Sequence, residues 1–252
     1  GGIPATGGRP PTGGIAETGG IAATGGIAET GGIAETGGIA ETGGIAETGG
    51  QPETGGQSGT GGGPAIGEPN SVAYTGCSMA NNIGNGNKRV GNGVMWNSDG
   101  YGTGAMVVQN WTSTNSSSWQ LFDQKMQSIG GKDVVKAVQV MICIFPQRAT
   151  DDEVRQMIQA AKDHTNPGTH IFLSGQPVYE AGHQCSLAGD GGADWTDEEA
   201  RKIAGEGIED VSYLGQWKLN SAAGEVMSDT CHATSSGEDA MARQANEYFP
   251  AN

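Results

Sequence analysis

The sequence has few basic residues and no long apolar run. Its 252 residues include 13 Lys and Arg against 28 Asp and Glu, a formal net charge of -15. Because this charge repels phosphate groups, we expect neither nucleic acid nor anionic lipid headgroups as partners. No apolar stretch reaches the roughly 20 residues that span a bilayer, so we expect no membrane span. The chain begins at Gly1 with no signal peptide, which indicates a processed or trimmed chain.

Cysteine is scarce but even in number. The four residues are Cys77, Cys143, Cys185 and Cys231, and all lie outside the glycine-rich end of the chain. They lack the close Cys or His pairs of a zinc site, so we expect no bound metal. Two disulfides are the simplest interpretation, and they indicate an oxidising compartment outside the cell or at its surface. Free buried cysteines are the alternative.

Glycine is abundant, with 46 residues concentrated in the N-terminal quarter. From Gly1 to Gly62 a Gly-Gly pair recurs at every sixth residue without interruption. The unit Gly-Gly-Ile-Ala-Glu-Thr is unaltered in five hexads, which start at Gly13, Gly25, Gly31, Gly37 and Gly43. This strict period predicts a repeat segment over residues 1–66, followed by a second domain over residues 67–252.

The hexad favours a three-fold helix. Six residues make two turns of a polyproline-II or polyglycine-II helix, and proline recurs at the fourth position, at Pro4, Pro10, Pro52 and Pro64. A β-solenoid with stacked isoleucines and a disordered linker are the alternatives. A single glycine-rich strand cannot bury enough surface to offset its loss of entropy. We therefore expect the repeat to self-associate in a bundle or filament.

After the repeat, segments typical of strands and helices alternate. Short apolar or β-branched runs predict strands over 71–75, 105–109, 138–145, 169–174 and 211–214. Capping boxes at Thr150, Thr196 and Ser235 predict three helices, and a periodic apolar pattern predicts another over 118–129. This alternation predicts an α/β fold, a parallel sheet flanked by helices. Active sites of such sheets lie at the carboxyl ends of the strands.

Two short motifs carry candidate chemistry. Ser78 follows the first expected strand, and Gly76 permits a sharp turn that would lift the serine hydroxyl above the sheet edge. Asp229 precedes His232 by three residues, just before the last expected helix. At that spacing a carboxylate can hold an imidazole in the tautomer that a general base needs. Either motif alone also fits an ordinary turn or a polar loop.

Together and in this order, the two motifs resemble the SGNH, or GDSL-like, hydrolase family. The stretch DTCHATSSGE at 229–238 is similar to that family's final block, and QPVYEAGHQCSLAG at 176–189 is similar to one secreted branch. The resemblance covers roughly residues 68–252 and implies a flavodoxin-like parallel sheet. It implies Ser78 as nucleophile, His232 as general base and Asp229 as orienting carboxylate, with no cofactor and no metal.

The resemblance also implies an oxyanion hole. Its donors would be the backbone N–H of Ser78 and an N–H of Gly102 or Gly104. The family's third block normally ends in Gly-x-Asn-Asp, whose Asn donates to the oxyanion, but the matching stretch here is ICIFPQ, without Asn. Gln147 at its end is the candidate substitute. Since the loss of one donor lowers turnover by about 10²–10³, a weakened or inactive enzyme is the alternative.

The cysteines fit the same resemblance. Strands one and three are neighbours in the family's sheet, which implies a Cys77–Cys143 pair, and Cys185 and Cys231 would lie on two adjoining loops. The family usually has Asp where this chain has Cys77. A thiol nucleophile at Cys77 is a competing interpretation.

These features predict an extracellular serine hydrolase of carboxylic esters, or a polysaccharide deacetylase, that is anchored or assembled through its repeat. Its substrate would be an ester or an acylated glycan. The alternative is a structural subunit of an extracellular filament or surface fibre with a weakened or inactive hydrolase-like domain. Trp96, Trp111 and Trp119 either form a wall of a sugar site or pack in the core.

Overall fold

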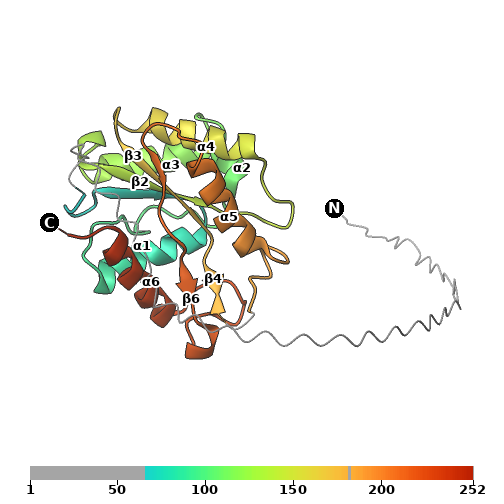
Figure 1. Ribbon diagram of the computed structural model, residues 1–252. Helices are drawn as coiled ribbons and strands as arrows, with labels where there is room; N and C mark the ends of the chain where they lie inside the picture. Colours follow the sequence, from blue (N-terminus) through green and yellow to red (C-terminus); the bar gives the residue numbers. More distant parts are fainter. Residues whose placement is uncertain (1–65, 181–182, 252) are drawn as a thin grey trace, which may run out of the picture. The chain divides into compact units, whose positions relative to one another are not determined.

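The structure is a computed structural model that describes residues 66–180 and 183–251 (Figure 1). The hexad repeat, and with it the expected three-fold helix or β-solenoid, lies outside the described residues. In the described ranges, none of the helices combines the length and the apolar character needed to cross a membrane.

A sheet of four parallel strands lies at the centre of the domain, in the order β1-β2-β3-β5. The strands are β1 (Val72–Thr75), β2 (Ala137–Ile142), β3 (His170–Gly175) and β5 (Val211–Tyr213). Every residue of β2 is buried, as expected for an apolar run in the middle of a sheet that is covered on both faces. The fold is α/β, and its sheet is compatible with a flavodoxin-like arrangement.

Helices cover both faces of this sheet. α4 (Asp151–His164) and α5 (Gly192–Ala204) pack against β2 and β3, while α1 (Ser78–Val90) and α6 (Ser235–Tyr248) pack on each other. Figure 1 shows α1 and α6 below the sheet and α4 above it. The remaining elements are α2 (Val108–Trp111), α3 (Ser117–Ser128), the 3-10 turns η1 (Lys132–Val134) and η3 (Ser221–Ala223), and the strand pair β4 (Val178–Tyr179) and β6 (Lys218–Leu219).

The three expected helix starts have different outcomes. The capping box at Thr150 is present, since its hydroxyl accepts from the Glu153 N–H at 3.2 Å and the Glu153 carboxylate accepts from the Thr150 N–H at 2.8 Å. The cap expected at Ser235 is wrong by one residue, because the hydroxyl of Thr234 accepts from the Gly237 N–H at 3.3 Å and α6 begins at Ser235. The cap expected at Thr196 is wrong, because α5 already begins at Gly192. The Thr196 hydroxyl instead accepts from a backbone N–H just after β3.

The strand expected over 105–109 is also wrong. The chain turns at Met106, whose N–H donates to the Thr103 carbonyl, and then enters the short helix α2. Tertiary hydrogen bonds decide this conformation: the Val108 N–H donates to the Cys143 carbonyl at 3.0 Å, and the Asn110 side chain accepts from the Val107 N–H at 2.8 Å. The apolar residues of this segment therefore belong to a loop and a helical turn that pack against the end of β2.

The three tryptophans considered for a sugar site belong to the core. Trp96, Trp111 and Trp119 are each 0% exposed, and their indole N–H groups all donate to backbone carbonyls. The acceptor for Trp111 is the carbonyl of Gly76, at 3.1 Å. The aromatic core therefore supports the turn that leads from β1 to Ser78.

Candidate active site

Ser78 stands at the first position of α1, two residues after a turn that requires glycine. Gly76 has φ +131°, and a Cβ there would lie 2.9 Å from the Cβ of Met141 and 3.0 Å from its carbonyl oxygen. Cys77 precedes the helix as its N-cap, and its carbonyl accepts from the Thr103 hydroxyl at 2.8 Å. The sequence thus brings the Ser78 hydroxyl to the carboxyl edge of the sheet on a closely packed turn.

His232 reaches Ser78 because α1 and α6 pack tightly. The imidazole lies in the loop just before α6, and Gly86 of α1 lets that helix approach, since a Cβ there would lie 2.0 Å from the Glu238 carbonyl oxygen. Arg89 adds ion pairs from α1 to Glu238 and Asp239 in the first turns of α6. This packing fixes the two ends of the candidate site relative to each other.

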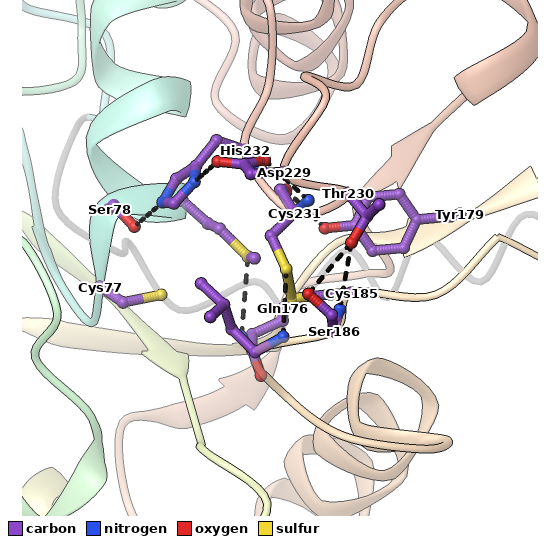
Figure 2. Close-up of a disulfide and its surroundings, with 12 residues drawn as sticks. Cys77, Ser78, Gln176, Tyr179, Cys185, Ser186, Asp229, Thr230, Cys231 and His232 are labelled. Carbon is purple, nitrogen blue, oxygen red and sulfur yellow. Dashed lines mark hydrogen bonds and ion pairs between the residues drawn. A yellow bond between two sulfur atoms is a disulfide. The ribbon is translucent and has the colours of Figure 1, made fainter.

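Ser78, His232 and Asp229 form one hydrogen-bonded chain (Figure 2). The Ser78 Oγ lies 2.7 Å from His232 Nε2, and His232 Nδ1 lies 2.5 Å from Asp229 Oδ2. With its Nδ1 proton held by the carboxylate, the imidazole presents a lone pair at Nε2 and can take the serine proton. The structure therefore brings together the nucleophile, base and carboxylate expected from the sequence.

Asp229 is held in its ionised form. Burial favours the neutral carboxyl, but hydrogen bonds from the Cys231 N–H and from the side chain and N–H of His232 outweigh it and lower the pKa of Asp229 to about 2. Its Oδ1 accepts both backbone N–H groups at 3.0 Å, which leaves Oδ2 for the imidazole. A permanently charged carboxylate stabilises the imidazolium that forms when Ser78 loses its proton.

The loop that carries His232 is braced by a disulfide and by side chains. Cys231 is bonded to Cys185, and Figure 2 shows this bond beside Asp229 and Thr230. The His183 ring contacts the Thr230 carbonyl through Nε2 at 3.0 Å. Thr230 has φ +68°, an uncommon conformation for a residue other than glycine, which these surrounding contacts maintain.

The second disulfide joins Cys77 to Cys143, at the ends of β1 and β2. These two pairs are the ones that the family resemblance implied, and together they use all four cysteines of the chain. A Cys77 thiol nucleophile is incompatible with this bond, because its sulfur is shared with Cys143. Each disulfide has one cysteine directly before a residue of the candidate site, Ser78 or His232.

A pocket with a volume of about 260 Å³ opens beside Ser78 and His232. Its wall is mainly apolar and comes from the loop before α2, the end of β2 and the loop after β4. The lining residues besides these two are Cys77, Met79, Gly104, Ala105, Met106, Val107, Cys143, Ile144, Phe145, Gln176 and Leu187. A reacting group bound at Ser78 would therefore place one apolar substituent in this pocket.

Of the expected oxyanion donors, Ser78 and Gly104 line this pocket, whereas Gly102 and Gln147 do not. The Ser78 N–H donates to the carbonyl of Gly104 at 2.8 Å, so this N–H is already engaged in a hydrogen bond. Gly102 is not among the lining residues. Gln147 is exposed and lines a neighbouring pocket of about 390 Å³. The sequence-based assignment of Gln147 as the substitute for the missing Asn therefore receives no geometric support.

Gln176 lines the pocket beside Ser78, and the sequence analysis did not name it as a candidate site residue. It is 3% exposed and directly follows β3 at the carboxyl edge of the sheet. That position was the available signal, because active sites of parallel sheets lie there.

Within the described ranges, no cluster of three or more His, Cys, Asp or Glu side chains has a metal-binding arrangement.

Comparison with protein-family models and with curated proteins finds no match to this chain.

Proposed function

We propose that this chain is a serine hydrolase of the SGNH type that cleaves carboxylic esters. The observation that carries the proposal is the hydrogen-bonded chain from Ser78 through His232 to Asp229 beside an apolar pocket. A surface serine with no catalytic role has no need of a base at 2.7 Å that is itself oriented by a carboxylate. The order of the motifs in the sequence and the parallel sheet support the family assignment.

The reaction proceeds in two halves. Ser78 Oγ attacks the carbonyl carbon while its proton moves to His232 Nε2, and the tetrahedral intermediate expels the alkoxide. The alkoxide takes the proton from His232 and leaves as the alcohol, with the acyl group on Ser78. His232 then deprotonates a water molecule that attacks the acyl-enzyme. The carboxylic acid departs, and Ser78 regains its proton.

The acyl group is the part of the substrate that the pocket suits. An apolar substituent on the carbonyl carbon would lie against Met106, Ile144 and Phe145, whereas an acetyl group would leave most of the roughly 260 Å³ empty. We therefore favour esters of longer apolar acids over acetylated glycans. The two disulfides suit a secreted or surface-exposed enzyme.

A structural role is the second candidate. Its support is the absence of the third-block Asn and the engagement of the Ser78 N–H with the Gly104 carbonyl, which together remove two usual oxyanion donors. The strict hexad of residues 1–62 supports self-association. Sedimentation of the full chain over a hundredfold concentration range tests it: growth in mass supports assembly, and a constant monomer mass contradicts it.

Labelling with a fluorophosphonate probe tests the hydrolase proposal. The native protein should be labelled, while Ser78→Ala and His232→Ala should not. Ser113→Ala and His170→Ala are matched controls, because Ser113 is exposed and His170 lies at the start of β3, outside the pocket lining. Both controls should be labelled like the native chain. A folded native protein that resists the probe would refute the hydrolase and leave the structural role.

A further inference from the structure

An ester hydrolase needs donors for the oxyanion, and of the expected backbone and side-chain donors only Gly104 lines the pocket without its N–H being engaged by another described residue. The negative charge that forms on the substrate oxygen requires N–H groups already in place, about 2.7–3.1 Å from that oxygen. The Ser78 N–H is donated to Gly104, and Gln147 faces a different pocket. A donor that replaces the missing Asn must therefore be sought among the buried polar side chains that line the pocket.

Gln176 is a buried side chain held in one orientation. Its Oε1 accepts from the Ile144 backbone N–H at 3.3 Å. Because a backbone N–H can be satisfied only by an acceptor, the carboxamide oxygen is on the Ile144 side and the NH₂ group is on the opposite side. That side faces Met79, the neighbour of Ser78, with Nε2 at 3.7 Å from the Met79 sulfur.

The NH₂ group of Gln176 has spare donor capacity. It carries two N–H bonds, and a thioether sulfur is a weak acceptor. Among the described residues, the Met79 sulfur is the only hydrogen-bond partner of Nε2. A buried donor without a good acceptor is energetically unfavourable, and a substrate oxygen would supply the acceptor that it lacks.

The backbone of Gln176 is rigidly placed. Its N–H donates to the Thr196 hydroxyl at 2.9 Å. The preceding Gly175 allows α5 to come this close, since a Cβ there would lie 2.4 Å from the Asp197 backbone nitrogen. The side chain is therefore fixed before any substrate binds, as a donor to a transition state should be.

We infer that Gln176 is a catalytic residue whose Nε2–H donates to the oxyanion formed when Ser78 attacks the carbonyl carbon. It takes the role of the Asn that the third block lacks, from the next strand of the sheet. This inference rests on the proposed ester hydrolase. It also assigns the missing donor to Gln176 in place of Gln147, the substitute that the sequence suggested.

The test compares Gln176→Glu with Gln147→Glu at pH 8. Glu keeps an oxygen acceptor for the Ile144 N–H and nearly the same shape, but it replaces the NH₂ donor with oxygen. Gln176→Glu should lower kcat on a p-nitrophenyl ester, and the rate of fluorophosphonate labelling, by about 10²–10³, with KM within threefold of the native value. Gln147→Glu should leave all three unchanged.

Two further readouts separate this role from a structural one. Melting temperatures report folding, and Gln176→Met, which also lacks the donor, should lose kcat to a similar extent. The inhibition constant of a boronic acid, which forms a tetrahedral adduct on Ser78, should rise with Gln176→Glu far more than KM does. Labelling of folded Gln176→Glu at the native rate would overturn the inference. An unlabelled native protein would instead refute the hydrolase itself.

Discussion

The phenol of Tyr179 donates a hydrogen bond of 2.7 Å to the carbonyl oxygen of Cys231, the residue before His232. Burial raises the pKa of the Tyr179 hydroxyl, so it stays a donor throughout the physiological range. Tyr179 forms the end of β4, which pairs with β6. A strand pair outside the main sheet thus contributes to the position of the loop that carries His232.

Tyr179→Phe should weaken catalysis without altering substrate binding. The variant keeps the ring and removes only the hydroxyl, so kcat should fall about three- to tenfold while KM stays constant. The free energy of unfolding should fall by about 1 kcal/mol, the usual effect of one hydrogen bond. Steady-state kinetics and urea unfolding measure both. A kcat equal to that of the native protein would show that the loop is positioned without this bond.

Removal of the Cys185–Cys231 disulfide should affect both stability and turnover. The bond closes a loop of 46 residues, and such a cross-link typically contributes about 2–4 kcal/mol to the free energy of unfolding. The double variant Cys185→Ala, Cys231→Ala should also lose at least tenfold in kcat, because the loop of His232 gains freedom. Thermal unfolding and esterase assays at 20 °C separate the two effects. Loss of stability with unchanged kcat would contradict a positioning role.

Asp229 should make the fold sensitive to acid. Its pKa is about 2 in the folded chain against an ordinary 3.8, so its stabilising contribution is complete above 3.8 and lost as the pH falls through 2. The free energy of unfolding at pH 7 should therefore be larger for the native protein than for Asp229→Asn. This difference in free energy should become smaller as the pH falls from about 4 to about 2. Urea unfolding across this range measures it. A difference that stays constant with pH would refute the linkage.

Asp229→Asn should also reduce turnover far more than stability. An amide at this position carries no charge to stabilise the imidazolium, and its NH₂ group favours the wrong imidazole tautomer, so kcat should fall by about 10³–10⁴. Assays at pH 7 check this value, with circular dichroism to confirm folding. A loss smaller than tenfold would mean that the carboxylate is not part of the catalytic apparatus.

The apolar pocket predicts a dependence on acyl-chain length. Each buried CH₂ contributes about 0.8 kcal/mol, so kcat/KM for p-nitrophenyl esters should rise about fourfold per carbon from acetate until the pocket is filled. Phe145→Ala should flatten this rise, because Phe145 is part of the pocket wall. A preference for acetate in the native protein would contradict the assignment of the pocket to the acyl group.

Local sequence patterns predicted those features that local physics decides. The apolar run of β2 and the capping box at Thr150 are properties of neighbouring residues, and both are present. Ser78, Asp229 and His232 could be named as candidates because each lies next to a strand end or a helix start, and the structure places their side chains in one hydrogen-bonded chain. The strand and the capping box depend on backbone hydrogen bonds and burial among neighbouring residues, which a local pattern contains.

The errors arose where distant residues decide the conformation. Residues 105–109 have the composition of a strand, but the carbonyl of Cys143 captures the Val108 N–H and begins a helical turn instead. The local sequence at Thr196 resembles a helix cap. Its actual hydrogen-bond partner, the Gln176 N–H, is twenty residues away and is therefore not visible in that local sequence. The orientation of the Gln176 carboxamide depends on Ile144, in a loop after another strand. No local pattern contains these relationships.

Each disulfide includes the residue immediately before a member of the proposed catalytic triad: Cys77 before Ser78 and Cys231 before His232. Reduction of the chain would therefore release both ends of the proposed site from their scaffold at once, so its chemistry would depend on the redox state of the surroundings.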